Sequence, residues 1–537
     1  MNKESNGDSS LFNQMLSELE KATRSWWDIT VILYTYLVKG LDFISVREAE
    51  FIRDYGDKEY SDKYIYTDAY KTFVKILSVS EDRYEISPSQ MTEVIQEFKK
   101  IRAILGEDYN HLTVLSSIYS FLLCLDSYAG DWLDKIWDEK EVGPLNCNTE
   151  LGFALYLRGN RMLTSAAKDC GFYDQNLQIS FRAALPHLIF WQIRTNLRGV
   201  VIPLPSAPFF KGAINQKAQD GSLDISLRIA VLPLDCALSG STEKSVQPYL
   251  KLHNRTNSSI YWEYAPDGQD RITAKVMKDL EAALKWNPHI IMFPEYSIGK
   301  EQLRKIEEYV LENKKTLIKK NLKFIIAGTT WETVEKEDGS FEYDNICHVI
   351  ALTNTWKSYK AEEYCEYVGE AKNRDGSSLF TRVETLTHPA KELTTPYLQN
   401  IGYVQIPICR DVINSEGQQS IAGIVADRLS PTLILVPAWS SSHDRFIKPL
   451  DRFVGLYYSC VVLCNSCTAA LGTRIGLAGV PQRYQAIHDM YMKHIPSECG
   501  VCRENCTSRD ESCVFLANIT NRANHTRDSI DFSFSRV

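Results

Sequence analysis

The stretch IPICRD, residues 406–411, is the most informative part of this chain for its fold class. An apolar segment ends in a cysteine and passes directly into charged residues, as expected where a buried strand stops. Upstream, HIIMFPE at residues 289–295 has the same form and ends in a carboxylate. In α/β folds, ligands bind at the carboxyl ends of strands and in the loops that follow them. The two stretches therefore predict an α/β fold with Cys409 and Glu295 at strand ends.

These two residue types suit nucleophilic catalysis. A free thiol is mostly protonated at neutral pH, and a neighbouring carboxylate can accept its proton during attack. We therefore interpret Cys409 as a nucleophile and Glu295 as its general base. Two structural interpretations compete with this one. Cysteine is often a buried packing residue, and a glutamate can be an N-terminal helix charge stabilised by the helix dipole.

The surrounding sequence alternates between strand and helix patterns. Helical spacing of apolar residues predicts a helix over 270–286, and Ser297 is a candidate cap for the next helix. Apolar runs predict strands at 225–232, 322–327, 346–352, 403–408, 433–436 and 461–463. Because these runs are apolar on both faces, we expect layered sheets covered on both sides.

The first 200 residues have a different pattern. They are rich in Trp and Tyr, and residues 91–105 place Val94, Ile95, Phe98, Ile101 and Leu105 on one helical face. Prolines and glycines then mark 201–224 as a linker. We predict a helical accessory domain at 1–200, a linker at 201–224 and an α/β domain at 225–537.

Four strand ends occur in order, at 293–295, 325–329, 406–411 and 434–439. This succession resembles the nitrilase, or carbon–nitrogen hydrolase, superfamily over about residues 223–537. The resemblance implies an α-β-β-α sandwich, here preceded by an all-α N-terminal domain, and a Glu–Lys–Cys triad. It further implies hydrolysis of a non-peptide, amide-type carbon–nitrogen bond in a small molecule, through a thioester on Cys409. No cofactor is expected for that catalysis.

The lysine of the triad is open among four candidates: Lys357, Lys360, Lys372 and Lys391. We favour Lys372, because Glu384 follows it where the family carries a second glutamate that helps to orient the catalytic groups. Trp439, after a later strand, is expected to support the pocket. Arg410 follows the cysteine where the family often has an aromatic residue, which puts the substrate in question.

A second cysteine group lies near the end of the sequence: Cys499, Cys502, Cys506 and Cys513. Four thiolates within 15 residues suit a tetrahedral structural zinc. The spacing lacks paired CxxC knuckles, so free thiols are the alternative interpretation.

Composition and charge limit the kinds of partner and the cellular compartment that we expect. A net charge of −8 over 537 residues argues against broad nucleic-acid binding through phosphates. The apolar stretches are shorter than the roughly 20 residues that a membrane span requires. The first ten residues are polar and the 14 cysteines are spread along the chain. We therefore expect a cytoplasmic protein.

Two further expectations concern partners. The apolar stripe at 445–458 suits a homo-oligomer interface, although the same helix could pack on its own sheet. The alternative to an enzyme is a catalytically idle nitrilase-like scaffold, or an anti-phage defence component, whose helical half binds a protein partner.

Overall fold

The computed structural model divides the chain into two compact units, 1–160 with 167–194, and 161–166 with 195–537. The described residues are 5–21, 25–43, 46, 51, 71–77, 86–105, 111–136, 146–148, 153–157, 185, 188–192, 196–197, 200–210, 215–217, 223–234, 250–254, 259–264, 269–361, 365–367, 381–384, 386–399, 401–413, 420–429, 431–440, 444–457, 459–466, 476–479, 513–521 and 530–537. Each unit is described by itself below.

The first unit combines helices with a small sheet. Its helices are α1 (Ser5–Lys21), α2 (Trp26–Phe43), α5 (Pro88–Leu105) and α6 (His111–Ile136), and its strands are β1 (Asn146–Asn148), β2 (Phe153–Leu157) and β3 (Leu188–Gln192). Phe98 of α5 and Phe121 of α6 lie in one aromatic cluster with Phe73. The three strands pair antiparallel in the order β1-β2-β3. The expectation of an all-α N-terminal domain was therefore wrong. Its strands are short and few turn residues mark their ends, so the sequence pattern did not distinguish them from helix.

The second unit is mixed α/β, as expected. Its larger sheet has the strand order β14-β13-β12-β11-β8-β22-β23, with β7 also pairing with β8. The bounds are β7 (Asn215–Lys217), β8 (Leu223–Val231), β11 (Ile290–Met292), β12 (Phe324–Glu335), β13 (Phe341–Ala351), β14 (Thr355–Tyr359), β22 (Phe515–Asn521) and β23 (Ile530–Arg536). The β8, β11 and β12 strands are parallel neighbours, so their carboxyl ends lie at one edge of the sheet.

A second sheet has the order β21-β20-β19-β18-β17-β6. Its strands are β6 (Phe209–Phe210), β17 (Tyr397–Leu398), β18 (Gly402–Gln405), β19 (Leu433–Ala438), β20 (Cys460–Asn465) and β21 (Gly476–Gly479). A separate sheet joins β15 (Cys365–Tyr367), β16 (Thr381–Glu384), β10 (Ser259–Tyr264) and β9 (Leu250–Asn254), and β4 (Asn196–Leu197) pairs with β5 (Val200–Val201).

The segment expected to be a linker, 201–224, instead contributes to both large sheets. Within it, β6 pairs with β17 and β7 pairs with β8. Proline is tolerated at sheet edges as well as in linkers, so proline content alone did not distinguish the two.

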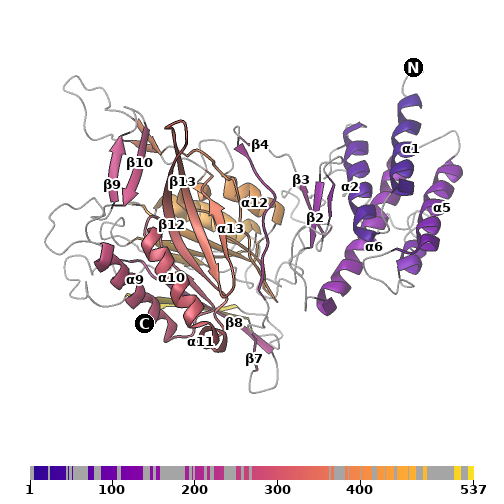
Figure 1. Ribbon diagram of the computed structural model, residues 1–537. Coiled ribbons are helices and arrows are strands. Elements are labelled where there is room, and N and C mark those ends of the chain that lie inside the picture. Colours follow the sequence, from indigo (N-terminus) through magenta and orange to yellow (C-terminus); the bar gives the residue numbers. More distant parts are fainter. Residues whose placement is uncertain are drawn as a thin grey trace. The chain divides into compact units, whose positions relative to one another are not determined.

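Two hydrophobic cores define the layers of the second unit. Ile229, Ile290 and Ile326 of the larger sheet join one core with the smaller sheet. Their neighbours Ala230, Ile291 and Ile325 face the opposite side and pack with α9 (Gln269–Leu284) and α10 (Lys300–Glu312). Helices α12 (Ile421–Leu429) and α13 (Asp444–Tyr457) cover the smaller sheet. The layers are therefore helices, sheet, sheet and helices (Figure 1).

The α10 helix begins at Lys300 with Gly299 as its cap, rather than at the expected Ser297. The Ser297 hydroxyl instead donates to the Pro294 carbonyl.

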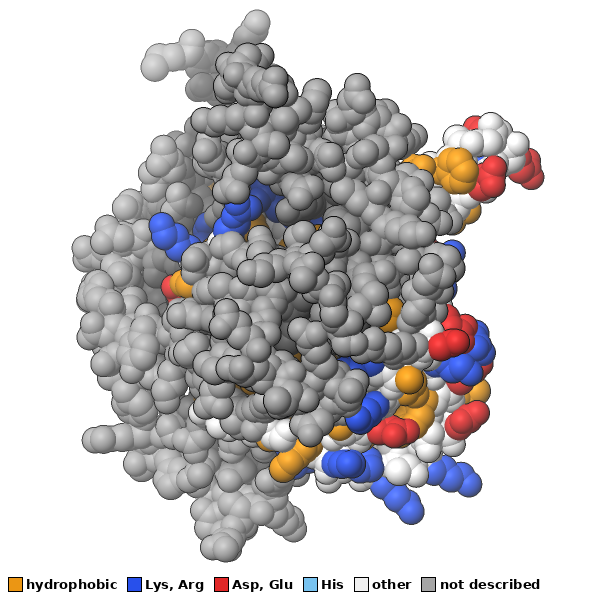
Figure 2. Space-filling model, turned by 90° about the vertical axis from the view of Figure 1, so that its left-hand side faces the viewer, with side chains coloured by type: hydrophobic (Ala, Val, Ile, Leu, Met, Phe, Trp, Pro, Cys, Tyr) orange, Lys and Arg blue, Asp and Glu red, His pale blue; other side chains and the backbone are white. Residues whose placement is uncertain are grey.

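On the surface of α10, Arg304 pairs with Glu301 and Glu308. Described basic and acidic side chains also lie side by side on the face shown in Figure 2. After α10 come the short α11 (Lys314–Lys319) and β12. Among the described residues, no helix is long and apolar enough to span a membrane.

The expected oligomer stripe on α13 is not an exposed surface. Four of its apolar side chains are buried in the core of the same chain: Phe446, Leu450, Phe453 and Val454. The helix therefore packs on its own sheet, and those side chains cannot form a dimer contact without leaving that core.

Candidate active site

Glu295 follows β11 in a loop with unusual backbone geometry. Tyr296, the next residue, has a φ of 54°. Gly328 in β12 adopts a φ of 63°, and a β-carbon there would lie 2.2 Å from the Pro294 carbonyl oxygen. The Tyr296 N–H donates to the Thr329 hydroxyl at 3.0 Å. Close backbone approach at a glycine thus sets the position of the Glu295 loop.

The Glu295 carboxylate is 1% exposed and is held from three directions. Its Oε1 accepts hydrogen bonds from Lys360 Nζ at 2.8 Å and from Asn345 Nδ2 at 3.0 Å. Its Oε2 accepts from the Trp439 backbone N–H at 3.1 Å. Because its donors come from β13, from the end of β14 and from the end of β19, the carboxylate has a fixed orientation.

Lys360 stands at the end of β14 and is as deeply buried as its partner, at 1%. Its backbone N–H donates to the Asn345 carbonyl at 2.9 Å, and its carbonyl accepts from the Ala390 N–H at 3.2 Å. Its ammonium also lies 5.7 Å from the centre of the Tyr296 ring. These contacts hold a positive charge in the interior beside Glu295.

Cys409 lies four residues beyond Gln405, the last residue of β18, at the start of a 3-10 turn, η2 (Cys409–Val412). It is 4% exposed. Its backbone φ of 42° is one that residues other than glycine rarely adopt. Its thiol lies 4.0 Å from the Trp439 carbonyl oxygen, and the charges of Glu295 and Lys360 both act on the pKa of the thiol. A strained residue on a sharp turn after a strand is typical of a nucleophile.

The electrostatic setting keeps the thiol neutral at rest. Burial, reinforced by the negative charge of Glu295, raises the pKa of Cys409 well above its ordinary value, and Lys360 partly opposes this rise. The arrangement therefore favours proton transfer to Glu295 during attack over a preformed thiolate.

The structure brings together Glu295, Cys409 and Trp439 with Lys360, one of the four candidate lysines but not the favoured one, and adds Asn345. Lys372, the favoured lysine, lies outside the described residues. Glu384 ends β16, and its side chain is not described. Lys391 lies over the Tyr359 ring at 5.7 Å. The pattern that identified Glu295, a polar residue directly after an apolar run, is absent before Lys360, because the β14 sequence TWKSY is buried only at its end.

The cysteines expected to bind zinc are mostly outside the described residues, as is the case for Cys499, Cys502 and Cys506. Cys513 is described, half-buried against the core between the large sheets. The zinc site therefore stays a prediction.

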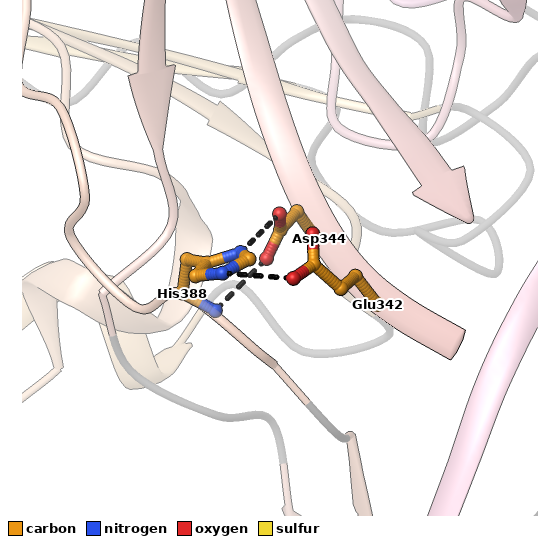
Figure 3. Close-up of side chains that lie close together, drawn as sticks. All are labelled: Glu342, Asp344 and His388. Atoms are coloured by element: carbon orange, nitrogen blue, oxygen red, sulfur yellow. Dashed lines mark hydrogen bonds and ion pairs between the residues drawn. The ribbon is translucent and has the colours of Figure 1, made fainter. Parts of the chain in front are cut away.

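Glu342, Asp344 and His388 are another group that could hold a metal (Figure 3). His388 Nδ1 lies 2.8 Å from Asp344 Oδ2, and its Nε2 lies 3.3 Å from Glu342 Oε1. The same Glu342 oxygen lies 2.6 Å from Lys336 Nζ. A hydrogen bond from Lys336 keeps the pKa of Glu342 below its ordinary value. A cation would have to displace that ammonium, so we read the group as an ion network.

No protein-family model and no curated protein matches the chain. Among solved structures, it is similar to the glutamine-dependent NAD+ synthetase from Acinetobacter baumannii, at 14% identity and a TM-score of 0.28, over 55% of this chain and 45% of the synthetase. It is also similar to an amidase from Nesterenkonia sp., at 10% identity and a TM-score of 0.26, over 50% of this chain and 88% of that one. For the C. elegans NitFhit protein the identity is 15% and the TM-score 0.27, over 52% and 63%.

At these identities and TM-scores the similarities assign no superfamily to this chain, so the resemblance seen in the sequence stays a prediction. The chain spans less than half the length of the synthetase. TM-scores of 0.26–0.28 assign neither an activity nor a substrate to this chain.

Proposed function

We propose that this chain hydrolyses an amide-type carbon–nitrogen bond in a small molecule through a cysteine acyl-enzyme. Cys409 is the nucleophile, Glu295 the general base, and Lys360 the cation beside the reacting oxygen. The main support is a buried ion pair, with both side chains 1% exposed, at the thiol of a strained strand-end cysteine. Burying two charges costs several kcal/mol per ion before their attraction, which makes a purely structural role an expensive one.

The geometry suits a two-step reaction. The Cys409 sulfur attacks the substrate carbonyl carbon while its proton passes to Glu295. The carbonyl oxygen becomes an anion, which the Lys360 ammonium stabilises. Collapse of this intermediate breaks the carbon–nitrogen bond, and Glu295 returns its proton to the leaving nitrogen. Water, deprotonated by Glu295, then hydrolyses the thioester and releases the acid, and the sulfur regains its proton.

Asn345 and Trp439 act on the base rather than on the substrate in this scheme. Each donates a hydrogen bond to a different oxygen of Glu295. Together they leave the carboxylate oriented as the proton moves, so little reorganisation accompanies the reaction.

The test is the reactivity of Cys409 toward iodoacetamide, followed by mass spectrometry of its peptide. We expect labelling at neutral pH, and a decrease of about a hundredfold in Glu295→Gln, because a general base contributes roughly that factor or more. Cys464, a fully buried thiol on β20, is an internal control that should label slowly in both proteins.

Labelling of Cys409 that is no faster than that of Cys464, or is unchanged in Glu295→Gln, would instead support an idle scaffold. Substrate identity follows from a metabolite screen comparing the wild type with Cys409→Ala. A metabolite consumed only by the wild type should be an amide, and its products an acid and an amine.

A further inference from the structure

Asp411, two residues after the candidate nucleophile, connects two of the strand ends of the site. It is 4% exposed. Its Oδ2 accepts the backbone N–H of Ile408 at 3.1 Å, and its Oδ1 accepts the backbone N–H of Ala361 at 3.0 Å. Ile408 immediately precedes Cys409, and Ala361 immediately follows Lys360. One buried carboxylate therefore ties the segment carrying the thiol to the segment carrying the ammonium.

The first of these bonds stabilises a strained turn. The Asp411 N–H donates to the Ile408 carbonyl at 2.9 Å, while the Asp411 carboxylate accepts from the Ile408 N–H. The two bonds both join Ile408 to Asp411, and they close the turn that contains Cys409. A non-glycine residue in the left-handed region costs about 1–2 kcal/mol, so its neighbours have to hold it there.

The second bond fixes the lysine segment. Lys360 is already held at its own N–H and carbonyl by Asn345 and Ala390. The hydrogen bond from the Ala361 N–H to Asp411 also holds the next residue, and it links the lysine segment to the turn that contains Cys409. The Asp411 side chain thus joins the segment of the thiol directly to the segment of the ammonium.

We propose that Asp411 is a positioning residue, which sets the distance of the Cys409 thiol from Lys360 and Glu295. The inference rests on the proposed function, since it concerns how the same three groups are held together. A carboxylate suits this task because it offers two acceptor oxygens, one for each N–H. An asparagine in its place would turn an NH2 group toward one of the two backbone donors and lose that bond.

The experiment measures the pH dependence of Cys409 alkylation by iodoacetamide in the full chain. In Asp411→Asn, we expect the rate at pH 7 to fall about tenfold, because a misplaced general base loses part of its effect. We also expect the midpoint of the profile to shift by about half a pH unit or more, because the charges of Glu295 and Lys360 both act on the pKa of the thiol and would then act from different distances. Simple loss of stability, with the site intact, would not move this midpoint.

Two variants act as controls. Asp126 in α6 is also 4% exposed and accepts a long-range N–H, from Leu188 at 2.9 Å, but belongs to the other unit. Asp126→Asn should leave the alkylation profile unchanged. Asp411→Glu keeps both acceptor oxygens on a longer side chain, and a pocket lined by Asp411, Gln405 and Val425 offers room for it. We expect an intermediate profile.

The outcomes separate the two proposals. A wild-type profile in folded Asp411→Asn overturns the positioning role while leaving the proposed function intact. Should Asp411→Asn fail to fold, Asp411→Ser, which removes one acceptor oxygen, takes its place, and a wild-type profile in that variant overturns the role equally. If Glu295→Gln does not change the wild-type profile, the proposed function fails instead.

Discussion

Three buried hydroxyls of the first unit and the buried carboxylate Glu295 of the second unit are bonded in different ways. In the first unit, Thr30, Thr35 and Ser120 each donate to the carbonyl four residues earlier in their own helix. In the second, Glu295 is bonded by residues 50, 65 and 144 positions away. Local bonds satisfy a hydroxyl wherever a helix forms. Long-range bonds to a charge have to be assembled by the whole fold, which is why they indicate a site.

The largest effect should come from removing one charge of the buried pair. Lys360→Met keeps an apolar stem but leaves the Glu295 carboxylate buried without its cation. We expect a loss of about 4 kcal/mol in the free energy of unfolding, the cost of an uncompensated buried charge. Urea denaturation measures it.

Lys336→Met is the matched control for that variant. Lys336 pairs with Glu342 at 2.6 Å, but the two side chains are 45% and 23% exposed. An exposed ion pair contributes up to about 1 kcal/mol. Equal losses in the two lysine variants would contradict the comparison, because depth of burial would then make no difference.

A smaller effect is expected from filling the space beside the Glu295 loop. Gly328→Ala combines left-handed strain with a β-carbon 2.2 Å from the Pro294 carbonyl, so the loop has to move. We expect a loss of about 3 kcal/mol from strain and overpacking together. Slower alkylation of Cys409 should accompany it.

Gly339→Ala isolates the strain alone. Gly339 has a φ of 76°, and a β-carbon there would meet nothing within 4 Å. About 1 kcal/mol should be lost, with Cys409 labelling unchanged. If Gly328→Ala is no worse than Gly339→Ala, the close approach to Pro294 has no role in placing Glu295.

The smallest effect belongs to the first unit. Thr30→Val removes a hydroxyl whose acceptor, the Trp26 carbonyl, lies within the same helix. We expect a loss of about 1 kcal/mol or less. Thermal unfolding measures this loss, and Cys409 alkylation reports on the site in the second unit. A change in alkylation would show that the local bond affects the site.

The sequence predicted the strand ends that follow continuous apolar runs, and this is why Glu295 and Cys409 could be found. Lys360 follows β14, an edge strand of the larger sheet, whose sequence TWKSY is exposed at its start and buried only at its end. A strand covered on one face has no apolar run, so its end gave no signal.

The remaining contacts of the site depend on tertiary structure. Asn345 lies inside β13, and Asp411 acts through backbone groups, so neither has a local pattern. The short strands of the first unit and the pairing of β22 with β8 were missed for a related reason. Register between distant strands is set by packing, and a short strand carries little of that information.

The position of β8 has a consequence for how the protein folds. One side of β8 pairs with β11 soon after synthesis, but the other side pairs with β22, which is separated from it by most of the second unit's chain. Until residues 515–521 leave the ribosome, that side of β8 presents unpaired N–H and C=O groups to other chains in the cell. Such long-range pairing slows folding and leaves a nascent chain prone to aggregation, so a chaperone bound over β8 during translation would raise the yield of native protein.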